Sequence, residues 1–280
     1  MGNGFSSRSL SEADDESPSP RLKLDDIPES CLAVVMTYLE PVEICKLAVL
    51  NSAFRNASSA DFIWEEKLPS NYKYLLMVNG ENGKNTIGPG KKSIYAALCR
   101  PNSFDGGRKE VWLDTKTGGI CLSISSKALN ITGIDDRRHW NYIPTDESRF
   151  QTVAYLRTAW WVEVCGEEEF QFPAGTYSVF FKVHLGRCSM KQGRRKSSLE
   201  RIHGWEVKPV RFELTTSRGH RFTSQYFLEN HGKWVHYRVG EFSVDRPDEE
   251  TRISFSMTQI DCTHTKGGLC VDSVLVCPSF

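Results

Sequence analysis

Apolar residues change their spacing along the chain, and this change separates two kinds of predicted structure. Between residues 27 and 64 they recur at intervals of three and four, which is the period of a helix. Beyond Gly106 they alternate with polar residues, most clearly in TYSVFFKVHL (176–185), which is the period of a half-buried strand. The pattern therefore predicts a small helical unit followed by a larger β domain.

The helical unit is expected to contain three short helices. Pro28 suits a first helical turn and Glu29 stands beside the positive helix end, so the first helix begins here and ends at Pro41. Its core stripe is predicted to be Cys31, Leu32, Val35, Met36 and Leu39. A second helix follows Pro41 with the apolar face Ile44, Leu47 and Ala48, and a third begins near Ser59 with Phe62, Ile63 and Trp64.

Some apolar residues of this unit fall outside the predicted faces, namely Val34, Val49 and Leu50. Helices below about 12 residues are marginal in water by themselves, and a unit of roughly 45 residues builds a poor core. The surplus apolar residues therefore predict a partner that packs against them. The alternative is that the β domain covers them.

A known motif accounts for this unit. The matching residues are Leu24-Asp25-Asp26-Ile27-Pro28, Leu32, Val35, Leu39, Pro41, Ala48, Phe54 and Trp64, and in this spacing they resemble the F-box. The resemblance implies binding to a Skp-type adaptor, and through it to a cullin, in a ubiquitin ligase. The residues expected to bind the adaptor are Leu24, Ile27, Pro28, Leu32, Val35, Leu39, Pro41 and Leu50. Asn51 departs from the motif, because many F-boxes carry a basic residue or Cys near this point.

Residues 69–105 are interpreted as a connector. YKYLLMV and SIYAALC form short helical patches around the Gly-rich stretch NGENGKNTIGPGKKS. That stretch lacks the first Gly of a phosphate-binding P-loop and no strand precedes it, so a surface loop is expected.

The region beyond residue 106 contains many short strand-like runs and almost no helical periodicity. The runs are VWLD, ICLSIS, AWWVEV, TYSVFFKVHL, RFEL, WVHYRV, TRISFSMTQ and LCVDSVLV. Turn signals such as Thr117-Gly118-Gly119 separate them, and one helical exception is expected at SKALNI (126–131). The prediction is an antiparallel β-sandwich, so the whole chain is of the α+β class. The expected domains are a disordered tail (1–22), the F-box unit (23–68), the connector (69–105) and the sandwich (106–280).

The sandwich region also resembles a family, the phloem protein 2 type lectin domain of plants, over about 170 residues. The residues that carry this resemblance include Trp112-Leu113-Asp114, Lys127-Ala128-Leu129-Asn130-Ile131, Arg149-Phe150, Ala159-Trp160-Trp161-Val162-Glu163-Val164, Trp234 and Lys266-Gly267-Gly268-Leu269. The order of an F-box followed by such a domain is a known plant architecture.

This second resemblance implies a sugar site. Sugars stack their C–H faces on aromatic rings and hydrogen-bond to carboxylates. By family position, Trp140, Glu241 and Asp248 are the expected carbohydrate-binding residues, for a glycan of N-acetylglucosamine type. Gly133 stands where lectin-active relatives have a second Trp, so one stacking platform is missing. The alternative is that Trp140 is a core or rim aromatic and Glu241 a solvated strand end.

Two adjacent tryptophans, Trp160 and Trp161, are predicted to lie in one strand and so to face opposite sides of it. At most one can then be a core residue, although the family position favours packing for both. A basic loop, GRCSMKQGRRKSSLER (186–201), is interpreted as solvated, with an anionic partner, a nuclear signal or a phosphorylation site as alternatives.

Composition limits where the chain acts and what it binds. Lys and Arg total 35 and Asp and Glu total 35, so no overall charge draws the chain to nucleic acid or an anionic membrane. No apolar run is long enough to span a membrane, and the N-terminus lacks a signal-peptide core, so we expect the cytoplasm and/or nucleus. The 9 cysteines are then expected to be reduced, and their spacing predicts no metal site and no cofactor. Gly2 fits a loose myristoylation pattern, with a disordered tail as the alternative.

No catalytic motif is present, neither GxSxG, HExxH nor GxGxxG, so the chain is not expected to be an enzyme. The first hypothesis is that the chain is a substrate receptor of a ubiquitin ligase. Its sandwich would recruit a target protein, either glycosylated or unglycosylated. The second is a stress or defence lectin that acts largely independently of ubiquitination. The third, a hydrolase built on the sandwich, has the least support.

Overall fold

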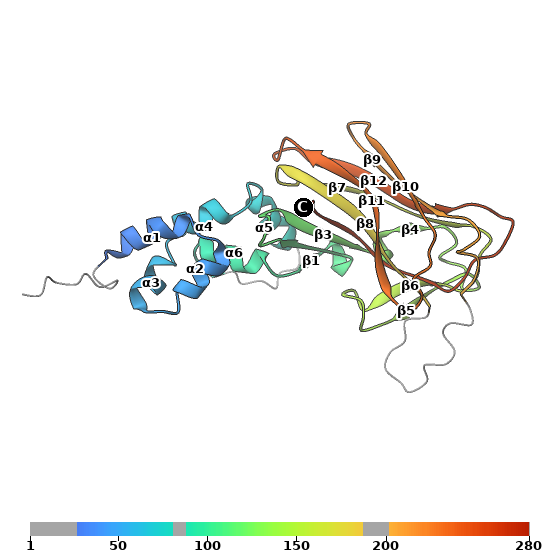
Figure 1. Cartoon of the computed structure of the whole chain (residues 1–280), viewed down its shortest axis with the longest axis horizontal. Helices are drawn as coiled ribbons and strands as arrows, with labels where there is room; N and C mark the ends of the chain where they lie inside the picture. Colours follow the sequence, from blue (N-terminus) through green and yellow to red (C-terminus); the bar gives the residue numbers. More distant parts are fainter. Residues whose placement is uncertain (1–26, 81–87, 187–201, 280) are drawn as a thin grey trace, which may run out of the picture. The chain divides into compact units, whose positions relative to one another are not determined.

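The computed structural model describes residues 27–80, 88–186 and 202–279, and its contacts divide the chain into two compact units, Met1–Ala60 and Asp61–Phe280 (Figure 1). Gly2, Leu24, residues 81–87 of the Gly-rich stretch and nearly all of the basic loop lie outside the described residues. The division at residue 60 comes before the predicted end of the F-box unit at residue 68.

The first unit contains α1 (Glu29–Thr37), α2 (Pro41–Leu47) and α3 (Ser52–Ala57) among its described residues. The first two helices are confirmed where the sequence predicts them. Helix α3 was not predicted, because six residues give little periodicity. The third predicted helix, near Ser59, is α4 (Asp61–Lys67), which belongs to the second unit. Asn51 supplies the N-cap of α3, with the side-chain oxygen accepting a hydrogen bond from the Phe54 amide at 2.9 Å. Asn51, which departs from the F-box motif, therefore stabilises the start of α3.

One face of α1 is buried, and α1 packs against α3. Its buried residues are Leu32, Ala33 and Met36. The predicted core stripe is therefore wrong for Cys31 and Val35, which are exposed. Residues 31 and 35 lie next to residues 32 and 36 around the helix. The unit is so small that this nine-residue helix buries only the side that carries residues 32 and 36.

The helices of the second unit are α4 (Asp61–Lys67), α5 (Tyr72–Gly80) and α6 (Lys91–Leu98). They include the two helical patches predicted for the connector. The Trp64 and Tyr95 rings lie 5.1 Å apart and join α4 to α6, while Tyr74 of α5 packs edge-on against Phe170 of the β domain, also at 5.1 Å. The connector helices are thus packed parts of the second unit.

The strands of the described residues form an eight-stranded and a five-stranded sheet, called here the large and the small sheet. The large sheet contains β1 (Asn102–Phe104), β2 (Lys109–Leu113), β3 (Ile120–Ser125), β5 (Trp140–Pro144), β6 (Thr152–Leu156), β8 (Gly175–Leu185), β11 (Trp234–Val244) and β13 (Leu269–Pro278). The small sheet has the order β10 (Arg221–Tyr226), β9 (Val210–Thr216), β12 (Thr251–Gln259), β7 (Val162–Phe170) and β4 (Asn130–Ile131). The ladders between these strands are antiparallel, which confirms the predicted sandwich.

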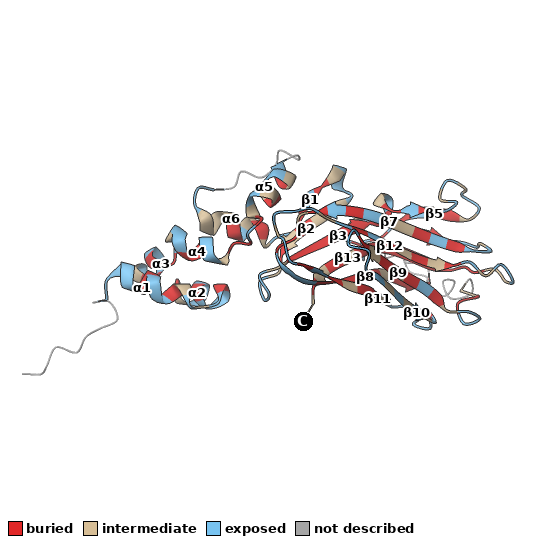
Figure 2. Cartoon of the chain, turned by 90° about the horizontal axis from the view of Figure 1, so that it is seen from above, coloured by how far each residue is buried: buried red, intermediate tan, exposed pale blue. Residues whose placement is uncertain are grey.

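Side chains from the two sheets meet in one core. Phe181 of the large sheet lies 5.7 Å from Phe212 and 6.0 Å from Phe255 of the small sheet, measured between ring centroids. Figure 2 shows the result as alternating buried and exposed bands along β7, β9 and β12. This alternation decides which residues of the small sheet face outward.

Two local predictions are corrected by the structure. The expected helix at 126–131 is a single 3₁₀ turn over Ser126–Ala128, followed by β4, because Asn130 and Ile131 pair with β7. Trp160 and Trp161 precede β7 and are not part of a strand. Strands β1, β5, β6 and β10 were not predicted.

In the described ranges, no group of three or more His, Cys, Asp or Glu side chains is placed to hold a metal ion, and no helix is long and apolar enough to cross a membrane. The cysteines in these ranges form no disulfide bond with one another.

Burial predicts a large difference in cysteine reactivity. Burial raises the pKa of the Cys121 thiol to about 12, so at pH 8 this thiol stays protonated and a poor nucleophile. Native-state alkylation with iodoacetamide, followed by peptide mass spectrometry, should modify the exposed Cys262 at least tenfold faster than Cys121. Equal rates in folded protein would contradict the packing of β3.

Candidate functional site

The first unit presents an unusual number of apolar side chains at its surface. These exposed residues, called here the apolar set, are Ile27, Val34, Val35, Tyr38, Val42, Val49 and Leu50. Val34, Val35 and Tyr38 are neighbours on one side of α1, by their spacing of three and four residues. The Tyr38 side chain is 86% exposed, which is costly for an aromatic ring unless another surface covers it.

The predicted adaptor-binding residues separate into two groups. Ile27, Pro28, Val35 and Leu50 are exposed and available to a partner. Leu32 and Pro41 are buried and Leu39 is half-buried, so these residues support the unit from within. Sequence reasoning missed Tyr38 and Val42. Both are apolar residues outside the predicted core stripe, and this property, shared with Val34, could have identified them.

The three predicted sugar-binding residues do not come together. Trp140 begins β5 and is 1% exposed, so its ring has no free face on which a sugar could stack. Glu241 lies on β11, half-exposed and ion-paired with Arg238, and Asp248 is exposed in the loop between β11 and β12.

Strand register gives their separation. Trp140 pairs with Leu156 of β6, which pairs with Leu269 of β13. Glu241 pairs with Ser178 of β8, which pairs with Cys277 of β13. Eight residues of strand at about 3.3 Å each place these two positions on β13 roughly 26 Å apart. Asp248 follows β11 at the same end as Glu241. One small sugar cannot contact Trp140 together with either carboxylate.

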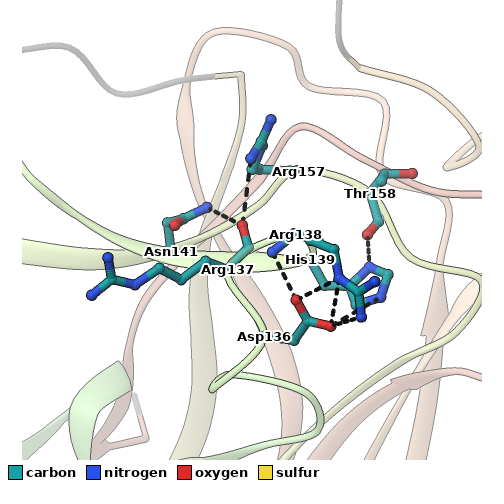
Figure 3. A network of polar contacts seen from close by, with 7 residues as sticks. All are labelled: Asp136, Arg137, Arg138, His139, Asn141, Arg157 and Thr158. Carbon is teal, nitrogen blue, oxygen red and sulfur yellow. Dashed lines mark hydrogen bonds and ion pairs between the residues drawn. The ribbon is translucent and has the colours of Figure 1, made fainter.

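A network of polar contacts fixes the loops near Trp140 (Figure 3). Asp136 accepts hydrogen bonds from the Arg138 amide at 2.9 Å and from its guanidinium at 2.7 Å, and these bonds lower the pKa of Asp136. The His139 ring nitrogen Nδ1 lies 2.7 Å from the Thr158 carbonyl oxygen, and the Arg157 amide donates to the His139 carbonyl at 2.7 Å. The loop before β5 is thereby held against residues 157 and 158.

The next residues along the chain are held by a buried lysine. The Lys266 ammonium donates to the carbonyls of Trp160 at 2.6 Å and His264 at 3.2 Å, and also to that of Asp261. Backbone hydrogen bonds of 2.9 and 2.8 Å pair Ala159 with Lys266. Burial lowers the pKa of Lys266, and the carbonyl oxygens compensate for its lost hydration.

The tryptophans held by this lysine are both accessible. Trp160 is 52% exposed and Trp161 is 48% exposed, and Ile260 at the end of β12 is 72% exposed. The expectation from the resemblance that both rings pack in the core is therefore wrong. A rigid backbone that displays two indole rings is a surface suited to binding.

Comparisons with known proteins agree with this two-part organisation. The family model described as "Phloem protein 2" matches residues 119–278. The F-box protein PP2-A13 of Arabidopsis thaliana is 57% identical over 269 residues, which cover 95% of this chain and 92% of that protein. The F-box protein PP2-A11 of the same plant is 50% identical over 283 residues, which cover 100% of this chain and 97% of that protein.

A helical unit with an exposed apolar set, followed by an antiparallel sandwich, defines a two-part F-box protein with a lectin-like domain. The chain belongs to the F-box proteins of the phloem protein 2 family. Among solved structures, TmCBM61 in complex with β-1,4-galactotriose is similar at a TM-score of 0.32 and 15% identity, covering 54% of this chain and 88% of that chain.

Removing the Lys266 ammonium should destabilise the sandwich. In Lys266→Met, three carbonyls lose the ammonium that donates to them, and we expect the free energy of unfolding to fall by roughly 3 kcal/mol. Urea denaturation of the full chain measures this change. Lys116→Met, at an exposed turn, is the matched control and should have no measurable effect. Equal stability of both variants would contradict the role of Lys266.

Proposed function

We propose that this chain is the substrate-recognition subunit of a ubiquitin ligase of the Skp-cullin-F-box type. Its first unit binds a Skp-type adaptor, which links it to a cullin, and its sandwich recruits the target. The observation that carries the proposal is the apolar set on the first unit, in a chain of the F-box family.

The apolar set supports adaptor binding for an energetic reason. Fully covering one Val or Leu side chain contributes about 1.5–3 kcal/mol, so a partner that covers several of these residues gains enough to bind stably. The small core of the first unit leaves such residues without internal partners, which favours a surface built for association.

In this proposal the chain itself performs no chemistry. It acts by proximity, holding a target near a ubiquitin-loaded enzyme that belongs to other subunits. The setting is the cytoplasm and/or the nucleus. The target is a protein, with or without a glycan, and the sandwich is the part that selects it.

Charge placed in the apolar set should abolish adaptor binding. Val35→Asp and Leu50→Asp each bury a carboxylate in an apolar contact, so each should weaken binding to a Skp-type adaptor at least 100-fold, about 3 kcal/mol. Isothermal titration calorimetry on the full chain measures this loss.

Conservative changes at the same positions are the matched controls. Val35→Ile and Leu50→Met keep the surface apolar and should bind within a fewfold of the unmodified chain, and circular dichroism checks that all four variants fold. Adaptor binding that tolerates both aspartates would overturn the proposed interface.

A further inference from the structure

Several large apolar side chains that are exposed on the second unit lie at one end of the small sheet. Each is at least 47% exposed, and together they are called here the apolar rim: Trp160, Trp161, Val207, Phe227 and Ile260. The proposed ligase role gives them no task.

Strand register places Trp161 beside Ile260. The last pair of the β7–β12 ladder joins Val162, the first residue of β7, to Gln259, the last residue of β12. Trp161 precedes Val162 and Ile260 follows Gln259, so both stand one residue beyond the same pair. Trp160 comes next along the chain.

The other strands of the small sheet bring Val207 and Phe227 to this end. Strand β9 is antiparallel to β12 and begins where β12 ends, and β10 is antiparallel to β9 and ends where β9 begins. Val207 lies shortly before β9, and Phe227 directly follows β10. Neighbouring strands are about 4.8 Å apart, so the ends of β10, β9, β12 and β7 fall within roughly 15 Å. The residues of the apolar rim are therefore close enough to contact one partner together.

The opposite end of the small sheet has a different character. Its connections at residues 217–220 and 245–250 consist mainly of charged and polar residues, and neither includes an exposed large apolar side chain. Apolar exposure is thus concentrated at one end of the sheet. A concentration of this kind marks an interaction surface, whereas single exposed apolar residues need no explanation.

Hydrogen bonds hold the segments that carry most of the apolar rim. The Lys266 ammonium donates to the carbonyls of Trp160 and Asp261, which ties the segment before β7 to the segment after β12. The Trp205 indole Nε1 donates to the Gly267 carbonyl at 2.8 Å and ties the segment before β9 to the same stretch. The backbone of the rim is therefore fixed in advance and loses little freedom when a partner covers it.

The basic loop starts and finishes at this same end of the sandwich. The Gly186 amide donates to the Gly268 carbonyl at 2.7 Å, and His203 pairs with Gly267, so the described residues on both sides of 187–201 adjoin one stretch of chain. In sequence, 187–201 has the single acidic residue Glu200 against the basic residues Arg187, Lys191, Arg194, Arg195, Lys196 and Arg201. Charge complementarity therefore favours an anionic partner at this end.

The chemistry of the apolar rim favours a lipid bilayer as that partner. Tryptophan is enriched at membrane–water interfaces, where its ring lies among the headgroups and its indole N–H keeps a hydrogen bond. Val207 and Ile260 add aliphatic surface, which gains little from the bases of a nucleic acid but is stabilised among acyl chains. Apolar contact combined with positive charge holds a protein at an anionic bilayer without any membrane-spanning segment.

We propose that the apolar rim is a binding surface for an anionic lipid bilayer, with Trp160, Trp161 and Ile260 inserted into the headgroup layer. Binding is peripheral and reversible, because a few partly exposed side chains enter only the outer part of the bilayer. The inference goes beyond the proposed ligase role and does not depend on it. It places the chain, together with any protein that it recruits, at a membrane surface.

Vesicle binding by the full chain tests this surface. The protein is prepared without an acyl chain on Gly2, and the probes are vesicles of phosphatidylcholine alone and of phosphatidylcholine with phosphatidylserine. Co-sedimentation should show saturable binding to the phosphatidylserine vesicles, at least tenfold stronger than to phosphatidylcholine alone and weaker at high salt. Trp160→Ala/Trp161→Ala and Val207→Ser/Ile260→Ser should each weaken this binding at least tenfold, because each removes apolar contact.

Tryptophan fluorescence separates insertion from electrostatic attraction alone. On binding, the emission should shift to shorter wavelength, and vesicles with brominated acyl chains should quench it. Trp160→Phe/Trp161→Phe keeps the rim aromatic, so this variant should bind within a fewfold of the unmodified chain but lose most of the quenching.

Met77→Ala is the matched control. Met77 is 74% exposed on α5, and this helix packs against Phe170 at the other end of β7, so the variant should bind vesicles within twofold of the unmodified chain. Circular dichroism checks that all variants fold. No binding to either kind of vesicle would overturn the proposal, as would undiminished binding by Trp160→Ala/Trp161→Ala or binding without quenching. A chain that binds a single-stranded RNA oligonucleotide but no vesicle would overturn it as well.

Discussion

The packing of the two sheets against each other is the constraint on which the rest of the second unit depends. Phe181 of the large sheet contacts Phe212 and Phe255 of the small sheet, and these contacts fix which side of β9 and β12 faces the core. A shift of one residue in either strand would exchange its inner and outer faces. The inward-facing phenylalanines therefore determine that the serines and carboxylates of these strands lie on the outer face of the sheet.

The two units use apolar residues in opposite ways. The sandwich encloses large side chains such as Trp140 and Trp205, and exposes two indole rings at Trp160 and Trp161, where Lys266 holds the backbone by a hydrogen bond. The first unit is too small to enclose its own apolar residues, and Val35 of α1 and Tyr38 at the C-cap of this helix remain at its surface. A protein that recruits a target needs both properties: a rigid domain that recognises the target, and an apolar surface whose burial by a partner is energetically favourable.

Local pattern was sufficient to predict the fold class, since the period of two in β8 and β12 reflects a core on one side of a sheet. Pattern could not predict the distance between Trp140 and Glu241, because that distance depends on the order of β5, β6, β13, β8 and β11. Strands distant in sequence decide that order. The exposure of Val35 was missed for a related reason. Helical spacing shows which residues are neighbours on the helix surface, but not which side of the helix packs against the rest of the unit.

The arrangement of side chains on the outer face of the small sheet could not be predicted from sequence either. Ser254 and Ser256 resemble any solvent-facing strand residues until the register places Glu167 and Glu213 on either side of them. The most direct test of the whole account is amide hydrogen exchange of the full chain with and without a Skp-type adaptor. We predict slower exchange confined to residues 27–51, with the sandwich strands unchanged. Slowing in the sandwich strands, or no change in residues 27–51, would contradict the assignment of adaptor binding to the first unit.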